Sequence, residues 1–448
     1  MALTRVNLAL IAVLLLGYAF LDKGFAYIGV FPVFIGEITF ALMLMITVIT
    51  GTNAQFLRNP ISLMLMLFLG WQVIILLFHT EGTWVNALRD SVTWAYAAFS
   101  LIVAGLLLRT RALTETLHWY GRWMPWFVFL AAPFFILADR FHELLPSFPG
   151  TDVTLLNIKA GDYGVHLAGA AAFFTLGLYK EFSPSKSSWF GLKDVLFASF
   201  LMMGVVAIGS RTRGGLLSVV LAVIVCFLFR PSNRLGRLLL PAAIVVFLLS
   251  AFDITIPTGY REISVNQILS NVESVIFDTK KKQLNETASW RIEWWKRILD
   301  DVSEGDEFWV GVGFGNSLAD IYGFDDATGN RSPHNAHLTI LARTGVPGFV
   351  LWILFILTTY TVLTFGYLNA NVNHQNTLAK INVWIMAYFT AFLVNMSFDV
   401  YLEGPQGGIW FWCLVGYAIA LSRSQRMNRM AARPVAPPQR FHTVATNR

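Results

Sequence analysis

The sequence predicts an all-α polytopic membrane protein with about twelve transmembrane helices and one large loop outside the membrane. Hydrophobic side chains make up 56% of the 448 residues and charged side chains only 13%, which is far more apolar than a soluble domain of this length. Apolar stretches long enough to cross a bilayer recur along the chain, and one mostly polar segment, 253–333, interrupts them.

About 20 apolar residues cross the hydrocarbon layer of a membrane, and apolar stretches near that length are the predicted spans. They fall at 6–21, 34–50, 60–78, 92–108, 122–138, 164–179, 192–208, 214–229, 236–252, 338–366, 380–398 and 406–421. The first span follows a basic residue, Arg5, but no small-residue cleavage site follows the span, so we expect a retained helix and not a removed signal peptide.

Basic residues predict the orientation of the chain, because cytoplasmic loops carry an excess of lysine and arginine. They fall on alternate connections, at Arg58, Arg109, Arg111, Lys180, Lys186, Lys193, Arg230, Arg234 and Arg237, and again in the tail at Arg423, Arg426, Arg429 and Arg433. Both termini are therefore expected in the cytoplasm, and the segment 253–333 outside it.

This division gives four predicted regions. Residues 1–252 hold the first nine transmembrane helices, 253–333 form a large periplasmic loop with interfacial helices, and 334–421 hold the last three spans. Residues 422–448 form a basic tail, disordered and cytoplasmic, in which Pro434, Pro437 and Pro438 fall within a stretch that has no apolar period.

Composition also excludes some classes of protein. Cys226 and Cys413 lie inside apolar runs, so they are expected to be packing residues and not a disulfide. The net charge of +6 comes from loops and the tail, where topology explains it, so nucleic-acid binding is not expected.

The polar segment contains two recognisable elements. Between Trp290 and Val302 apolar and aromatic residues recur at three- and four-residue spacing, which predicts a helix with one apolar face, lying on or in the membrane interface. Gly311–Asn316 is rich in glycine and is expected to form a turn; a nucleotide-binding loop would need a preceding strand and a following helix of a βαβ unit, which are not indicated.

Three arginines near the outer surface are candidate ligands for an anion. Arg211 and Arg213 lie between the seventh and eighth predicted spans, where unpaired arginine is costly, and Arg291 lies on the aromatic face of the predicted loop helix. Guanidinium groups bind phosphate oxygens two at a time, so a pyrophosphate is a natural ligand. The alternative for all three is an anchor at the membrane surface.

Two histidines, His334 and His337, are candidate proton acceptors just before the tenth predicted span. Three residues apart on a helix, they would share one face. The alternatives are structural histidines or a metal site, but the nearest carboxylates in sequence, Asp325 and Asp326, lie in a stretch typical of turns, and no third ligand has helical spacing.

At these residues the sequence resembles the O-antigen ligases and related polymerases of bacterial inner membranes. The ligase pattern is His, then Asn, Ser or Gln, nine residues, and Gly-x-x-Gly. His334, Asn335, Gly345 and Gly348 fit it. Other family features follow in the same order: a Ser-Arg segment at 210–215, an arginine before tryptophans at Arg291, and the glycine turn at 311–315. The resemblance runs from about the seventh span to the last.

The resemblance implies a GT-C-like membrane glycosyltransferase that works on the periplasmic face without metal, nucleotide or other cofactor. The implied donor is an undecaprenyl-pyrophosphate-linked polysaccharide, and the implied acceptor is a hydroxyl of the lipid A core oligosaccharide. His334 would be the general base, with a share for His337 as a separate hypothesis. Arg291 and either Arg211 or Arg213 would bind the donor pyrophosphate.

Two further functions remain open. An O-antigen polymerase or a protein O-oligosaccharyltransferase would share the donor and the base but use another acceptor; polymerases have two large outward loops, whereas 139–163 is short here. A lipid or sugar transporter would place charges near the middle of its spans, and the predicted spans are nearly free of charge.

Overall fold

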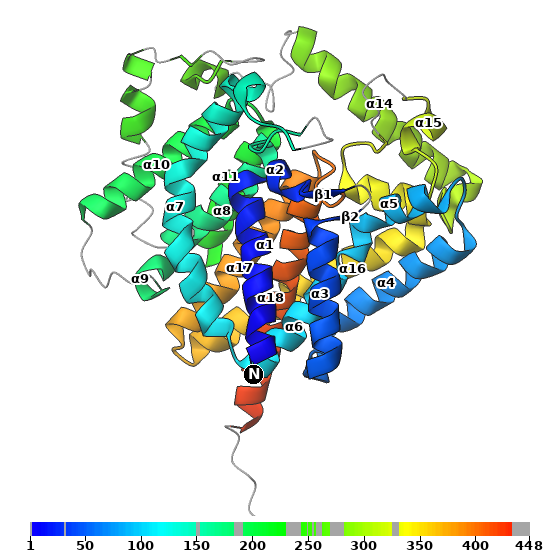
Figure 1. Cartoon of the computed structure of the whole chain (residues 1–448), viewed down its shortest axis with the longest axis horizontal. Coiled ribbons are helices and arrows are strands. Elements are labelled where there is room, and N and C mark those ends of the chain that lie inside the picture. Colours follow the sequence, from blue (N-terminus) through cyan, green and yellow to red (C-terminus); the bar gives the residue numbers. More distant parts are fainter. Residues whose placement is uncertain are drawn as a thin grey trace, which may run out of the picture.

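A computed structural model of the whole chain describes residues 2–30, 33–148, 153–182, 191–229, 243–248, 250–252, 255–256, 262–268, 282–324 and 331–431. The molecule is mostly helical (Figure 1), which confirms the predicted all-α class. Its described helices before the polar segment are α1 (Ala2–Leu21), α2 (Lys23–Ala26), α3 (Ile35–Thr50), α4 (Pro60–Phe78), α5 (Trp84–Ala95), α6 (Ala98–Thr110), α7 (Leu113–Arg140), α8 (Ala160–Thr175), α9 (Leu178–Phe182), α10 (Leu192–Gly209) and α11 (Arg213–Phe229).

The remaining helices are α14 (Lys282–Glu304), α15 (Leu318–Tyr322), α16 (Ala336–Val372), α17 (Asn376–Met396) and α18 (Pro405–Ala431). Short 3-10 helices lie at Ala54–Arg58, His142–Leu144 and Asp306–Phe308. The two strands β1 (Gly29–Val30) and β2 (Val33–Phe34) pair antiparallel, with Gly29 opposite Phe34.

Within the described residues, six helices are long and apolar enough to cross a membrane: α1, α4, α7, α10, α16 and α17. The pair α5 and α6 makes a seventh span if it is counted as one, and α3 and α11 are shorter apolar helices. A multi-pass membrane protein is therefore supported, while the number of twelve spans stays a prediction.

Several predicted spans differ from the helices found. The span 92–108 is a bent pair, α5 and α6, which meet at 40°. The span 164–179 ends earlier, at Thr175, and α9 follows it. Residues 422–431, which were assigned to the tail, continue α18 as helix, and the rest of the tail lies outside the described residues. Part of the span 236–252 also lies outside them.

The centre of the molecule is built from helices with small residues at their contacts. Every residue of α8 after Ala160 is buried, and α8 packs against α11 and α17. A Cβ placed on Gly164 of α8 would lie 2.6 Å from the Cα of Gly215 in α11, so glycine is required where these two backbones touch. This contact fixes the start of α11, which carries Arg213.

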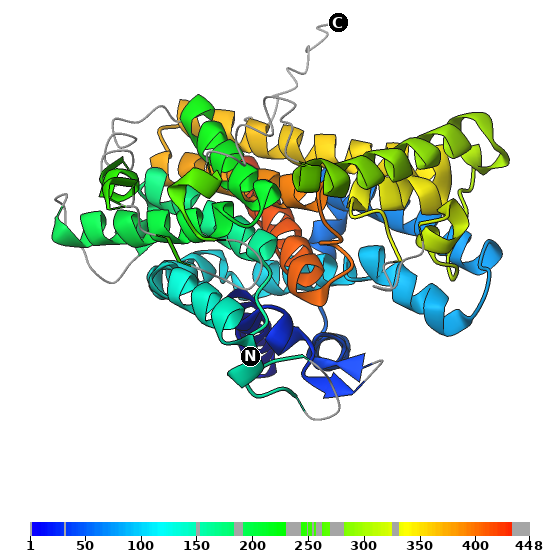
Figure 2. The same cartoon turned by 90° about the horizontal axis from the view of Figure 1, so that it is seen from above.

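The helix predicted in the polar segment is present as α14, but its apolar face contacts the protein. Trp294, Ile298 and Val302 are buried in a cluster with residues of α15 and α16, and α14 lies along α16 when the molecule is seen from above (Figure 2). Burying three such side chains contributes about 1.5–3 kcal/mol each to the stability of the packing. A location at the membrane interface stays a prediction.

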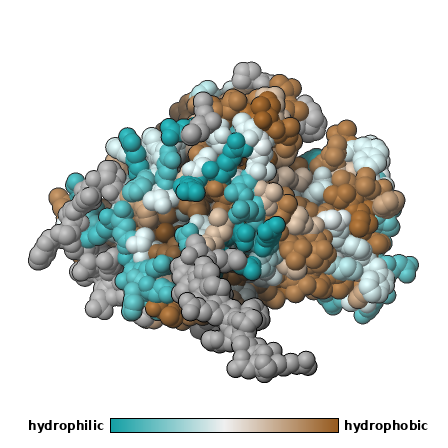
Figure 3. Space-filling view, turned by 90° about the horizontal axis from the view of Figure 1, so that it is seen from below, coloured by the Kyte–Doolittle hydropathy of each residue, from teal (hydrophilic) through white to brown (hydrophobic). Residues whose placement is uncertain are grey.

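The two ends of the molecule differ. The N-terminus and the last turns of α18 lie at one end, at the bottom of Figure 1, and α14 and α15 lie at the opposite end. Seen from below, hydrophilic residues cover the centre of the first end between hydrophobic flanks (Figure 3). Cys226 and Cys413 are both buried and free, as predicted.

Candidate functional site

His334 lies before α16 and not within it, so the expectation that His334 and His337 share a helical face is wrong. The backbone of His334 has φ +53°, in the left-handed region that a helix interior excludes. The next residue, Asn335, is the N-cap of α16: its Oδ1 accepts hydrogen bonds from the N–H groups of His337 (3.0 Å) and Leu338 (3.2 Å). The motif asparagine therefore starts the helix, and the histidine stays outside it.

The imidazole of His334 is directed at a carboxylate from another part of the chain. Its Nδ1 is 3.7 Å from Oδ1 of Asp399, in the turn between α17 and α18. The same carboxylate oxygen forms an ion pair with Nζ of Lys159, which directly precedes α8. The edge of the ring meets Trp290 of α14, with ring centroids 5.9 Å apart. His334 is half-buried, so one side of the ring remains accessible.

Arg291 of α14 reaches the same turn. Its Nη1 donates a hydrogen bond to the carbonyl oxygen of Phe398 at 3.2 Å, and its guanidinium lies 5.5 Å from the ring centroid of Trp290. Its Nε is buried without a hydrogen-bond partner among the described residues. Arg291 thus has a donor available beside Asp399, whereas Lys296 and Arg297 on the same helix are exposed.

The two arginines of the Ser-Arg segment have different surroundings. Arg211 forms an ion pair with Asp139 at the end of α7, so its charge is partly compensated within the protein. Arg213 begins α11, and the next residue, Gly214, lies against Phe398: a Cβ on this glycine would be 3.3 Å from the Cβ of Phe398. Arg213 therefore directly precedes a residue that packs against the turn reached by Arg291 and His334.

His337 has both ring nitrogens engaged by the protein. Nδ1 accepts a hydrogen bond from Nε1 of Trp352 at 2.9 Å, so Nε2 carries the proton of a neutral ring. Nε2 lies 3.1 Å from Oγ of Ser397, two residues before Asp399. This arrangement ties α16 to the end of α17, and both ring nitrogens of His337 have partners within the protein.

The two motif glycines sit at a break in α16. Gly345 has φ +65° and ψ −174°, which interrupts the helix, so the predicted uninterrupted span 338–366 is in fact two helical pieces. Nε1 of Trp71 donates to the carbonyl oxygen of Thr344 at 2.9 Å, which satisfies one free carbonyl at the break. At Gly348 a Cβ would lie 2.9 Å from Trp71, so a larger residue would displace that cap.

The charged groups around Asp399 favour one another's ionised forms. Burial alone raises the pKa of a carboxyl, but the charge of Lys159 and the interaction with His334 outweigh it, and the pKa of Asp399 is held well below its usual range. Burial would lower the pKa of Lys159, yet Asp399 and Asp162 raise it. Burial lowers the pKa of Arg291, and the charge of Asp399 opposes this shift.

Sequence reasoning missed Asp399 and Lys159, because each is a single charge at the edge of an apolar span, far in sequence from the histidine motif. It also missed the ion pairs that fix the segment just before His334. Asp90 of α5 binds Arg331 (3.1 Å) and the buried Arg343 of α16 (3.0 Å), and its Oδ2 accepts from the N–H of Gly315 (3.1 Å). The glycine turn at 311–315 is thereby fixed beside α16.

Across the described part of the chain, no group of three or more His, Cys, Asp or Glu side chains is arranged to hold a metal ion. Asp325 and Asp326, the carboxylates considered from sequence, lie outside the described residues.

Comparison with known protein families gave a match. Residues 198–353, from α10 to α16, match the family model described as O-antigen ligase. No curated protein matches the chain. The matched region contains Arg211, Arg213, Arg291 and His334, but not Lys159 or Asp399.

Proposed function

We propose, from the match that supports assignment of this chain to the O-antigen ligase family, that the protein is an O-antigen ligase of the inner membrane. The family supports a glycosyl-transfer enzyme of lipopolysaccharide biosynthesis, with lipid-linked polysaccharide and lipid A core as general partners. The specific proposal is transfer from undecaprenyl pyrophosphate to a core sugar hydroxyl on the periplasmic face, with both termini cytoplasmic and a GT-C-like fold.

One observation carries this proposal: three segments that are far apart in the sequence meet at Phe398 and Asp399. His334 lies 3.7 Å from Asp399, Arg291 donates to the Phe398 carbonyl, and Gly214, next to Arg213, packs on the Phe398 side chain. A proton acceptor and guanidinium groups thus border one turn, which is what transfer from a pyrophosphate requires.

The proposed reaction is a single displacement with inversion. The ring of His334 accepts the proton of the acceptor hydroxyl, whose oxygen forms a bond to the anomeric carbon of the donor. The bond between that carbon and the pyrophosphate oxygen breaks, and undecaprenyl pyrophosphate leaves with the electron pair. A positioned base contributes about 10²–10⁴-fold to such a reaction.

Asp399 and Lys159 are proposed to orient and balance the base. The carboxylate at Nδ1 favours the tautomer in which Nε2 accepts the proton, and it stabilises the imidazolium that forms. Lys159 keeps Asp399 ionised and restrains it, because the two form an ion pair. This pairing of a base with an orienting carboxylate follows the general logic of activated hydroxyl nucleophiles.

The arginines are proposed to bind the leaving pyrophosphate. Arg291 has an unpartnered Nε within the described structure, and Arg213 begins the helix that borders the same turn. Charge-assisted bonds from guanidinium to phosphate oxygens stabilise the charge that develops as the donor bond breaks. Arg211, whose charge is partly compensated by Asp139, is proposed as the alternative to Arg213 in binding the pyrophosphate.

The decisive experiment supplies purified protein in lipid nanodiscs with one undecaprenyl-pyrophosphate-linked polysaccharide and a series of acceptors. We expect transfer to lipid A core without added nucleotide, with inversion at the anomeric carbon by NMR of the product. Elongation of a second donor molecule in place of the core would identify a polymerase, and transfer to a protein would identify an O-oligosaccharyltransferase. No transfer to any acceptor would refute the proposal.

A further inference from the structure

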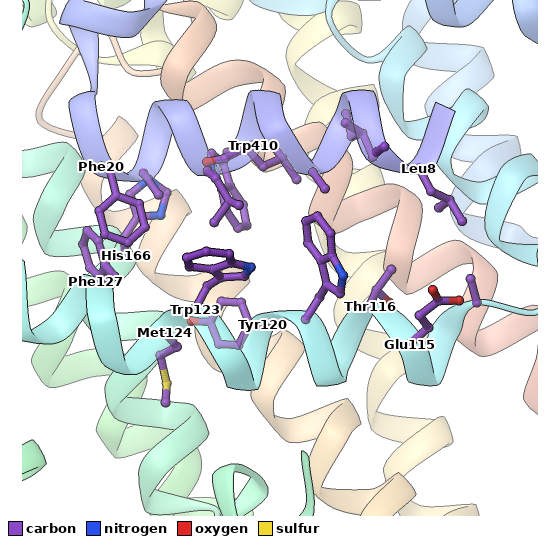
Figure 4. Close-up of a pocket in the computed structure, with 18 of the residues that line it drawn as sticks. Leu8, Phe20, Glu115, Thr116, Tyr120, Trp123, Met124, Phe127, His166 and Trp410 are labelled. Carbon is purple, nitrogen blue, oxygen red and sulfur yellow. The ribbon is translucent and has the colours of Figure 1, made fainter. Parts of the chain in front are cut away.

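A separate groove lies between α1 and α7, at a distance from the Phe398–Asp399 turn. It has a cavity volume of about 310 Å³, within the range of small-molecule sites, and α8, α17 and α18 form its floor (Figure 4). Phe20, Phe127 and His166 close one end, and Glu115 lies at the other. The remaining lining residues are mostly alanine, leucine and aromatic side chains.

The lining of the groove is apolar along nearly its whole length. On its floor, Nε1 of Trp410 donates to the carbonyl oxygen of Leu15 at 2.8 Å, and the hydroxyl of Tyr388 bonds Nδ1 of His166 at 2.7 Å. These polar atoms are satisfied within the protein, so they do not call for a polar ligand. On the wall, Trp123 projects from α7 toward α1 and remains 38% exposed (Figure 4). Such a surface fits a flexible hydrocarbon chain.

Opposite charges mark only one end of the groove. Arg5 of α1 and Glu115 of α7 line it there, both are exposed, and neither forms an ion pair with any residue that the structure describes. A cation and an anion that line the same end of a groove complement a headgroup that carries both a phosphate and an ammonium group. They complement a singly anionic headgroup less well, because Glu115 would repel it.

The length and direction of the groove fit a lipid from one leaflet. From Arg5 to Phe20 it follows α1 for about 22 Å at a rise of about 1.5 Å per residue. One leaflet contributes about half of the roughly 30 Å hydrocarbon layer, so a whole acyl chain fits. The charged end lies near the start of α1, opposite the end that carries α14, so the headgroup lies away from the Phe398–Asp399 turn.

We propose that this groove binds one acyl chain of an aminophospholipid from the leaflet nearest the start of α1, with Arg5 at the phosphate and Glu115 at the ammonium group. The site is a structural lipid site between α1 and α7. It is independent of the proposed transfer reaction, and its occupant is a phospholipid and not the donor.

The test uses native mass spectrometry of the delipidated full chain, titrated with phosphatidylethanolamine, phosphatidylglycerol or undecaprenyl phosphate. Ala12 lines the groove, and Ala12→Phe fills it; the adjacent Val13 is 59% exposed and does not line it, so Val13→Phe is the matched control. Ala9→Phe, a second filling variant, and circular dichroism guard against misfolding of the first.

For the wild type we expect one phosphatidylethanolamine molecule bound in preference to phosphatidylglycerol. Filling the groove should weaken binding roughly tenfold or more, because buried methylene groups lose their site, while Val13→Phe should bind as the wild type does. The double variant Arg5→Gln with Glu115→Gln should lose the headgroup preference, a change of about threefold to fivefold, the size expected of exposed charge pairs.

Three results would overturn the proposal. Equal binding of both phospholipids by the wild type would remove the role of the charges. Unchanged binding in both folded filling variants would place the lipid elsewhere. Displacement of phosphatidylethanolamine by undecaprenyl phosphate, blocked by Ala12→Phe, would assign the groove to the donor tail. None of these readouts depends on whether the protein transfers sugar.

Discussion

His334 owes its position to a left-handed backbone that few residue types adopt without strain. Because its φ is +53°, His334 does not continue the helical direction of α16. Its Nδ1 lies within ion-pair distance of Asp399. Histidine and asparagine tolerate this region better than most residues, so a probe of the imidazole should preserve the backbone. A second histidine, His374, has φ +57° in the turn before α17, outside the site.

Asparagine is therefore the best replacement for His334, because it removes the imidazole and keeps the backbone conformation. His334→Asn should lower the rate of transfer by about 10²–10⁴-fold, because the proton acceptor is lost while the turn is kept. The measurement is transfer in nanodiscs, with thermal stability recorded in parallel. His374→Asn, the matched control, should retain full activity. Transfer at the wild-type rate by His334→Asn would remove this histidine from the reaction.

Asp399 should act through the histidine and not on the substrate. Its pKa is lowered, so the carboxylate stays charged above the unfolded value of about 3.9 and loses its stabilising ion pair only as the pH falls toward the lowered pKa. Asp399→Asn should reduce kcat with little change in the acceptor KM, because the base loses the carboxylate that orients it.

The control for this prediction is Asp300→Asn, on the exposed face of α14. It should leave both kcat and the acceptor KM unchanged. A loss of folded protein in Asp399→Asn, with kcat per folded molecule unchanged, would indicate a purely structural role for the carboxylate.

A change at Arg291 should affect mainly the donor KM. Arg291→Lys keeps a charge but loses the planar group whose Nε is unpartnered in the described structure, so we expect a rise in the donor KM of about tenfold, the cost of one charge-assisted bond. Donor titration at saturating acceptor measures this. Lys296→Ala, exposed on the same helix, is the control; equal donor KM values in the two variants would reduce Arg291 to an anchor.

At the scale of elements, the break in α16 separates a short helix that directly follows His334 and Asn335 from a long apolar helix that is a candidate membrane span. Gly345 is essential to it: a Cβ there would lie 2.7 Å from the carbonyl oxygen of Phe308, and φ is +65°. The first piece begins at Asn335 and is tied to α5 by the ion pair of Arg343 with Asp90. The break thus sets the direction in which the chain approaches His334.

Gly345→Ala should destabilise the protein by about 1–3 kcal/mol from backbone strain alone, with a further cost for the close carbonyl. Gly70→Ala in α4 is the control, because nothing lies within 4 Å of a Cβ there and alanine favours helix by about 1 kcal/mol. Thermal unfolding in detergent should show a lower midpoint for the first variant and an equal or higher one for the second. Equal midpoints would contradict the requirement for glycine.

Long apolar helices were predictable, because their composition dominates every other signal, as for α4 and α17. The break in the run from 338 to 366 was missed although Pro347 follows Gly345 by two residues and favours one. The need for glycine at 345 was not predictable, because the carbonyl that excludes a side chain there comes from the segment around Phe308. The histidine and the arginines were found through a motif. Asp399 and Lys159 required three-dimensional proximity, because no local pattern joins them to His334.

At the scale of the whole molecule, the start of α1 and the end of α18 lie opposite α14. Together with the loop charges, this arrangement predicts that α14 faces the periplasm and the end of α18 the cytoplasm. Single cysteines at the exposed positions Glu304 and Asn428 test the orientation, since both native cysteines are buried.

A membrane-impermeant maleimide added to intact spheroplasts should label Glu304→Cys at once. It should label Asn428→Cys only after the membrane is permeabilised, and the unsubstituted protein should stay unlabelled in both conditions. Labelling in the reverse order would place His334 in the cytoplasm, away from a periplasmic acceptor, and the proposed function would fail with it.

The turn at Phe398 and Asp399 also lies late in the order of synthesis. Since α17 must be complete before this turn leaves the ribosome, Arg213, Arg291 and His334 are all synthesised and inserted before the residues that they converge upon. A nascent chain halted between residues 348 and 399 therefore holds every motif residue but lacks the turn on which they converge. Under the proposed mechanism, such a chain would not transfer sugar.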